Sequence, residues 1–135
     1  KKGFTMVELL AVIVIIAIIA LISTPYIIQY LKTAKRQSVV NSTQDAIKDA
    51  QARCLEGNCY FVVEDSKLYE ADSSFQRGEY ISTSGGTGEH GKIYIDPSGV
   101  GIAAVHNAEY CAYKNSGDKI VSVKEYKNNC EIKLN

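Results

Sequence analysis

The pattern of polar and apolar positions changes twice along this chain, and each change predicts a different kind of structure. Residues 4–22 are apolar at almost every position, with Glu8 as the one charged side chain among them. The apolar run continues past Pro25 to Ile28, and about 20 apolar residues are enough to cross the hydrocarbon core of a bilayer. The pattern therefore predicts a helix over 4–28 that is apolar on all sides and suits a membrane.

The same helix is predicted to continue beyond the apolar run as an amphipathic segment. Pro25 removes one backbone donor and should kink the helix rather than end it, because the apolar pattern resumes after it. Charged residues begin at Lys32, and Gly57 is a natural stop signal, so residues 29–56 are expected to form the continuation. Its apolar positions recur every three or four residues: Val40, Thr43, Ile47, Ala50 and Cys54.

Residues 57–135 are predicted to form a β-rich globular head, because short apolar runs alternate there with glycine-rich or polar turns. The strand candidates are 60–63, 80–81, 92–95, 102–105, 109–113, 119–123 and 131–134. We expect 109–113 and 119–123 to pair as a hairpin, 65–67 to be a polar connection, and 131–134 to be an edge strand. The amphipathic helix needs a partner for its apolar face, so the predicted fold class is α+β, a long helix packed on an antiparallel sheet.

Glu8 is the most informative residue of the apolar run. A carboxylate in the middle of a membrane costs roughly 2.5–3.5 kcal/mol or more, so such a residue indicates function. Glu8 stands four positions after Phe4, which follows Gly3 and the basic pair Lys1-Lys2. This constellation resembles the N-terminal signature of type IV pilins and of the related pseudopilins. The resemblance covers residue 1 to about residue 30.

The resemblance implies a processing route and an assembly mechanism. Residues 1–3 would be the remnant of a basic leader peptide. A prepilin peptidase would cut between Gly3 and Phe4 and then methylate the new amino group of Phe4. In a homopolymeric filament, built by an inner-membrane assembly platform, Glu8 would pair with the Phe4 ammonium of a neighbouring subunit. The family also often has a proline where this chain has Pro25, and its fold is the same long helix on a β-sheet.

The N-terminal charges indicate an orientation in the membrane. Lys1 and Lys2 should stay on the cytoplasmic side by the positive-inside rule. The chain would then cross the lipid bilayer once, with the head outside, and would reach an extracellular pilus after assembly. The first residue is lysine rather than methionine, so we interpret the chain as a trimmed precursor.

The four cysteines are expected to form disulfides, because an exported head favours oxidation over metal binding. Sequence alone leaves three pairings open. We favour Cys54–Cys59, which would close the turn around Gly57. We also favour Cys111–Cys130, which would resemble the disulfide-bounded C-terminal region of many pilins.

Other candidate chemistry is weak. A zinc site that uses His90 or His106 is the alternative to the disulfides, but the spacing of the first two cysteines fits zinc poorly. Residues 86–92 match most of a phosphate-binding loop, yet Ile93 stands where that loop needs Ser or Thr, and we expect a flexible surface loop. No nucleophile and base are paired in a catalytic motif. We therefore predict a protein that is not an enzyme, with no cofactor or metal, and a formal charge of zero does not favour nucleic acid as a partner.

Three functions are left open by the sequence. The first is a structural subunit of a type IV pilus, used for adhesion, motility or DNA uptake. The second is a pseudopilin of a type II secretion or competence system. The third is a membrane-anchored binding module that never polymerises. The two C-terminal cysteines favour the first, because major pseudopilins of secretion systems usually have a calcium-binding loop in that region.

Overall fold

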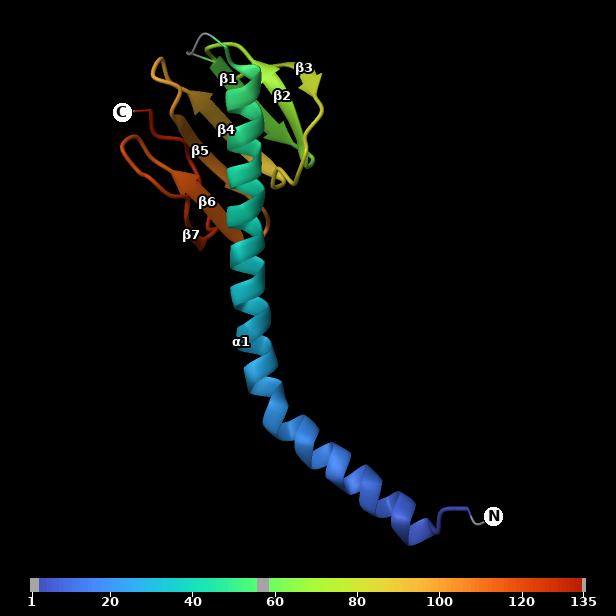
Figure 1. The fold of residues 1–135 in the computed structure, drawn as a ribbon. Helices are drawn as coiled ribbons and strands as arrows, with labels where there is room; N and C mark the ends of the chain where they lie inside the picture. The colour runs from blue at the N-terminus through green and yellow to red at the C-terminus, as the bar shows by residue number, and fades with distance from the viewer. Residues whose placement is uncertain (1–2, 56–58, 135) are drawn as a thin grey trace. The chain divides into compact units, whose positions relative to one another are not determined.

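The computed structural model describes residues 3–55 and 59–134, and these form one long helix followed by seven β-strands (Figure 1). The elements are α1 (Met6–Arg53), β1 (Cys59–Glu64), β2 (Lys67–Ala71), β3 (Arg77–Ile81), β4 (His90–Ile95), β5 (Gly101–His106), β6 (Tyr110–Lys114) and β7 (Ser122–Glu125). The predicted α+β class, a long N-terminal helix followed by an antiparallel sheet, is confirmed. The chain divides into two compact units, Lys1–Lys35 and Arg36–Asn135, which are described in turn.

The first unit contains the apolar part of α1. From Met6 onward every residue of this unit is helical, including Pro25. Many of these residues are isoleucine or valine, whose branched side chains do not favour helices in water. In a bilayer, however, each backbone N–H and C=O must be paired within its own segment, and a helix achieves this. The environment for which the sequence is suited therefore decides the local structure.

The second unit is a single antiparallel sheet with the last turns of α1 on one face. The strand order is β3-β2-β1-β4-β5-β6-β7, and every neighbouring pair is antiparallel. The β1–β4 pair is the one that joins strands distant in sequence, because the β2–β3 hairpin extends the sheet on the other side of β1. The edges of the sheet are thus β3 and β7.

The amphipathic stripe of α1 supplies the helical half of the core, as predicted. Its buried residues are Val39, Val40, Thr43, Ala46, Ile47 and Ala50. On the sheet, alternate residues of the central strands belong to the same core, for example Ile93 and Ile95 of β4 and Ala103 and Val105 of β5. This alternation is the two-residue period of a strand with one face on a core. The helix itself ends at Arg53, and the stop expected at Gly57 lies outside the described residues.

Strand β2 was not predicted from the sequence, where residues 65–67 were interpreted as a polar connection. Glu64 pairs directly with Lys67, so only Asp65 and Ser66 join β1 to β2. Both residues have positive φ, 50° and 63°, which is typical of the two-residue hairpin turn that matches strand twist. Glycine or asparagine usually marks this turn, and neither is present here. The missing glycine explains why the hairpin was overlooked.

The prediction of an edge strand over 131–134 is wrong, because these residues are irregular. Cys130 is bonded to Cys111, which lies on β6, and β6 already has β5 and β7 as neighbours. A segment tied to an interior strand has no free edge to pair with. The predicted hairpin between β6 and the next strand is confirmed, but β7 begins later than expected, with Ser122 opposite Tyr113.

The surface loop expected over 86–92 is shorter than predicted: residues 86–89 are irregular, with Gly86 and Glu89 exposed, but the Thr87 side chain is buried and β4 already begins at His90. The segment just before them is held on α1, since Ser84 donates from its backbone N–H and from its hydroxyl to the carboxylate of Asp49, at 3.1 and 2.9 Å. A Cβ on Gly85 would lie 2.5 Å from a carboxylate oxygen of Asp45. The glycines therefore allow the backbone to lie directly against the helix.

Candidate functional site

The helix begins with a reciprocal pair of hydrogen bonds between Thr5 and Glu8. The backbone N–H of Glu8 donates to the Thr5 hydroxyl at 3.1 Å, and the backbone N–H of Thr5 donates to Oε2 of Glu8 at 3.2 Å. This arrangement is a capping box, which satisfies two backbone donors that a helix N-terminus leaves unpaired. A negative charge in the first turn also interacts favourably with the helix dipole. Glu8 is therefore part of the local structure that starts α1 at Met6.

Most of the apolar side chains that follow Glu8 along α1 are exposed in the part of the chain that the structure describes. Large apolar residues from Phe4 to Leu31 are exposed, Phe4 at 88% and Leu21 at 78%. Among the described residues, α1 is long and apolar enough to cross a membrane, and its most apolar window is not buried. Leaving this much apolar surface in water is unfavourable. The helix requires either lipid or the apolar surface of other chains.

A comparison with protein-family models matches this region. The model described as the prokaryotic N-terminal methylation motif covers residues 1–24. The chain carries the N-terminal signature of type IV pilins and pseudopilins. This signature is that of a structural, non-enzymatic family, and it implies cleavage by a prepilin peptidase and assembly into a filament. A search of curated proteins and a search of solved structures gave no match to the chain.

The two residues of the expected cleavage site lie in the segment that leads into the helix, whereas Glu8 lies in its first turn. Gly3 and Phe4 precede α1, are not part of any helix or strand, and are exposed. No atom lies within 4 Å of the position that a Cβ of Gly3 would occupy. A protease needs an accessible backbone at the bond it cuts, and the bond between these two residues is accessible. Lys1 and Lys2 lie outside the described residues.

Pro25 is the other predicted feature of the apolar helix. Because proline has no N–H, the carbonyl of Leu21 cannot receive the usual helical hydrogen bond. One residue earlier, the hydroxyl of Thr24 donates to the carbonyl of Ala20 at 2.6 Å, a contact that often accompanies bending of a helix. The helix continues through this region without a break, and a kink at Pro25 stays a prediction.

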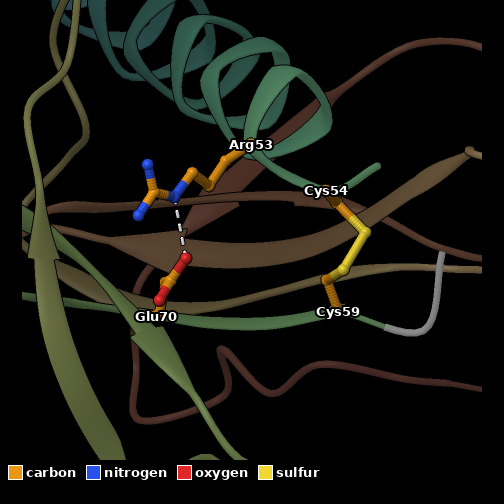
Figure 2. Close-up of polar contacts among 4 residues, drawn as sticks. All are labelled: Arg53, Cys54, Cys59 and Glu70. Atoms are coloured by element: carbon orange, nitrogen blue, oxygen red, sulfur yellow. Dashed lines mark hydrogen bonds and ion pairs between the residues drawn. A yellow bond between two sulfur atoms is a disulfide. The ribbon is translucent and has the colours of Figure 1, made fainter. Parts of the chain in front are cut away.

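The C-terminal end of α1 is fastened to the sheet by two contacts, which we call the helix-end clamp. Arg53 Nε donates to a carboxylate oxygen of Glu70 on β2 at 2.8 Å, and Cys54 forms a disulfide with Cys59 of β1 (Figure 2). The hydrogen bond and the charge of Glu70 raise the pKa of the Arg53 guanidinium. Both partners of the ion pair are about half exposed, so solvent weakens their attraction. We therefore expect the disulfide to be the stronger part of the clamp.

The second disulfide joins Cys111 of β6 to Cys130, across 19 positions of the chain. Cys111 alternates with Tyr110 and Ala112, which belong to the core under the helix, so its side chain points to the opposite face of the sheet. The C-terminal tail is therefore held on the face of the sheet that α1 does not cover. Both disulfides join the cysteines that the sequence analysis favoured as pairs.

Two contributors to these sites were not identified from the sequence. The capping role of Thr5 could have been found, because Thr5-Met6-Val7-Glu8 has the spacing of a capping box before an apolar run. The Arg53–Glu70 pair could not, because it depends on which strand lies beside the end of the helix.

Within the described residues, no group of three or more His, Cys, Asp or Glu side chains is placed to hold a metal ion.

Proposed function

We propose that this chain is a structural subunit of a type IV pilus. The observation that carries the proposal is the methylation motif over residues 1–24, on a helix whose apolar side chains are exposed from Phe4 onward. In the proposed route, cutting and methylation of the N-terminus prepare that terminus for assembly with other subunits. The exposed apolar surface supplies the driving force for such an assembly.

The parts of the chain have separate roles in this proposal. Residues 1–3 are the remnant of the leader and are removed. Residues 4–28 anchor the subunit in the cell membrane, with the N-terminus in the cytoplasm, and later form the filament core. Residues 29–56 connect this core to the head, and residues 57–135 are the head that the filament displays outside the cell. The partners are the prepilin peptidase, the inner-membrane assembly platform and further copies of the chain.

The charge of Glu8 gives the assembly its register. In the filament, apolar helices replace lipid around one another, and an unpaired carboxylate among them would be costly. Cleavage between Gly3 and Phe4 creates an ammonium group that can neutralise Glu8 of a neighbouring subunit. A subunit shifted along the axis would leave both charges unpaired. The capping box uses Oε2 of Glu8, so Oε1 is free of that contact and can accept a hydrogen bond from the ammonium group of the neighbouring subunit.

The exchange Glu8→Gln tests this role. Glutamine at this position still allows a capping box, so the variant removes the charge and keeps the start of the helix. In the native host, we expect at least a ten-fold loss of sheared surface filaments on immunoblots, with normal levels of subunit in the membrane. Glu89→Gln, which changes an exposed carboxylate of the head, is the matched control and should assemble normally. Normal filament yield from Glu8→Gln would refute the proposed role of the charge.

A pseudopilin of a type II secretion or competence system is the second candidate function, because the same motif introduces both kinds of protein. The disulfide that holds the C-terminal tail favours a pilus over a secretion-type pseudopilin. Electron microscopy of sheared filaments, labelled with an antibody against the head, separates the two. Long labelled surface filaments support the pilus, and their absence from a strain with active secretion or competence supports the pseudopilin. A membrane-anchored module that does not polymerise would keep residues 1–3.

A further inference from the structure

Two histidines face each other on the side of the sheet that α1 does not cover. His90 of β4 and His106 of β5 are direct partners in the antiparallel register, and the centroids of their rings are 5.7 Å apart. Ile93 and Ala103, at odd positions of the same two strands, point into the core under the helix. The even-numbered histidines therefore point away from that core. These are the two histidines of the sequence, and neither has a role in the proposed function.

The ring of His106 is held in a defined orientation. Its Nδ1 lies 3.2 Å from the backbone carbonyl oxygen of Asn107. A carbonyl oxygen accepts and never donates, so Nδ1 carries the proton in this contact, and the neutral ring then has its lone pair on Nε2. Tyr126 stacks on the same ring, with 4.0 Å between centroids and 7° between planes. Histidines that bind metals are commonly oriented in this way, with the second ring nitrogen donating to a backbone carbonyl.

The spacing of the two rings fits a shared metal ion. A zinc–nitrogen bond is about 2.0–2.1 Å, and the bonded nitrogen lies about 1.1 Å from the centre of its ring, so two imidazoles on one tetrahedral ion have centroids about 5 Å apart. The observed separation of 5.7 Å is slightly larger. Small rotations of the exposed ring of His90 would close the difference without any change in the backbone.

The surroundings of the pair leave room for an ion and supply oxygen. Both histidines line a cavity of about 470 Å³, and two carboxylate residues, Glu64 and Glu131, line it as well. Glu64 is paired with Arg77 at 3.1 Å, which leaves Glu131, on the C-terminal tail, as the better candidate for a third ligand. All four cysteines of the chain form the two disulfides, so no free thiolate competes for the ion.

We propose that His90 and His106 form an open, two-histidine site for a divalent transition-metal ion of the zinc type, with water completing the coordination shell. The described residues contain no preformed group of three ligands, so the ion would bind to the histidine pair first and then draw in the carboxylate of Glu131. The bound ion would join β4, β5 and the tail. This differs from the zinc site considered from the sequence, which would have required the cysteines. The site does not depend on filament assembly.

Titration of the full chain, untagged and in detergent micelles, with Zn²⁺ alone tests the proposal. Isothermal calorimetry should give one ion per chain, and the imidazole ¹⁵N signals of both histidines should shift together. His90→Ala and His106→Ala should each weaken binding by at least the roughly ten-fold that changes around metal ligands usually cause. Glu131→Gln should weaken it less. Lys92→Met, at another residue of the cavity wall, is the matched control and should bind as the wild type does.

The identity of the metal gives a second comparison. Imidazole ligands favour Cu²⁺ and Ni²⁺ as well as Zn²⁺, whereas Ca²⁺ and Mg²⁺ require oxygen ligands. A millimolar excess of Mg²⁺ should therefore not displace zinc. Zinc binding with wild-type affinity in either histidine variant, a shift of one histidine alone, or displacement by Mg²⁺ would each overturn the proposal, and so would the absence of zinc binding to the wild-type chain.

Discussion

Thr5 and Glu8 bind each other's backbone, with the Thr5 hydroxyl accepting from the Glu8 N–H at 3.1 Å and the Glu8 carboxylate accepting from the Thr5 N–H at 3.2 Å. The Glu8 carboxylate, whose charge is proposed to be neutralised in the filament, thus already caps the helix in the single subunit. In lipid, these hydrogen bonds lower the cost of the carboxylate, because part of its polarity is satisfied locally. Exchanges at the two positions should separate capping from charge.

The first prediction concerns capping alone. Thr5→Ala removes the hydroxyl that accepts from the Glu8 N–H and should destabilise the first turn by about 1 kcal/mol. That energy corresponds to an increase of about five-fold in the opening equilibrium. Amide hydrogen exchange of Glu8, measured by NMR in micelles, should accelerate by this factor. Thr5→Ser keeps the hydroxyl and should exchange at the wild-type rate. Equal rates in the wild type and Thr5→Ala would contradict the capping role.

The second prediction concerns the helix-end clamp. Replacing Cys54 and Cys59 together by serine opens a short loop, closed across 5 positions, and should lower the free energy of unfolding by about 2 kcal/mol. The Cys111–Cys130 disulfide closes a longer loop of 19 positions, so replacing both of its cysteines by serine should lower the free energy of unfolding by about 3 kcal/mol. Urea unfolding of the full chain in micelles, followed by circular dichroism, measures both.

The ion pair of the clamp provides the internal comparison for this series. Arg53→Met removes the contact with Glu70 but should change stability much less than loss of the nearby disulfide, since both side chains are half exposed. A larger loss from Arg53→Met than from the double serine variant would show that the ion pair, and not the disulfide, holds the end of the helix.

Much of the fold could be predicted because its signals are local. The apolar run, the later stripe on α1 and the run over 92–95 each depend on periodicity within a few residues. The turn at Asp65 and Ser66 lacks the usual glycine, so β2 was missed. The tail was assigned to a strand because the position of β6 inside the sheet, between β5 and β7, is a long-range fact that the favoured Cys111–Cys130 pairing does not reveal.

In the candidate site, too, the features with a local signal could be predicted and those that depend on long-range contacts could not. Glu8 is visible in the sequence because one charge interrupts an apolar run, and the role of Thr5 is readable from its spacing. The contact between Arg53 and Glu70 depends on the position of β2, and the histidine pair depends on the register of β4 against β5. Such relationships follow from the three-dimensional pairing of strands, which single-sequence patterns do not specify.

The third prediction concerns a buried hydroxyl in the core. Thr43 of α1 is fully buried, and among the described residues its Oγ1 has no hydrogen-bond partner. A buried polar atom without a partner costs about 1–3 kcal/mol. Thr43→Val keeps the shape and removes the hydroxyl, so it should raise the free energy of unfolding by about 1 kcal/mol or more. Thr43→Ser keeps the hydroxyl and loses a methyl group, and it should be destabilising. A destabilised valine variant in urea unfolding would indicate that the hydroxyl is satisfied.

The fourth prediction compares two glycines of the sheet. A Cβ on Gly91 of β4 would lie 2.5 Å from Cα of Val105 on the neighbouring strand, and the β5 backbone cannot move without breaking its pairing. We expect Gly91→Ala to cost about 2–3 kcal/mol. Gly99 has a backbone conformation that favours glycine, with φ +88°, but nothing lies within 4 Å of the position that a Cβ would occupy there. Gly99→Ala should therefore cost only about 1 kcal/mol. Thermal unfolding of the two variants should reproduce this order, and the reverse order would contradict the close approach at Gly91.

The central claim is that this chain is processed at its N-terminus and assembles through it. Mass spectrometry of the protein isolated from sheared surface filaments of the native host tests both parts at once. The account predicts a chain that begins at Phe4 and carries one methyl group on its amino nitrogen, a mass increase of about 14 Da expected from N-methylation alone. A chain that retains Lys1-Lys2-Gly3, or that is found in the membrane and never in filaments, would contradict the account.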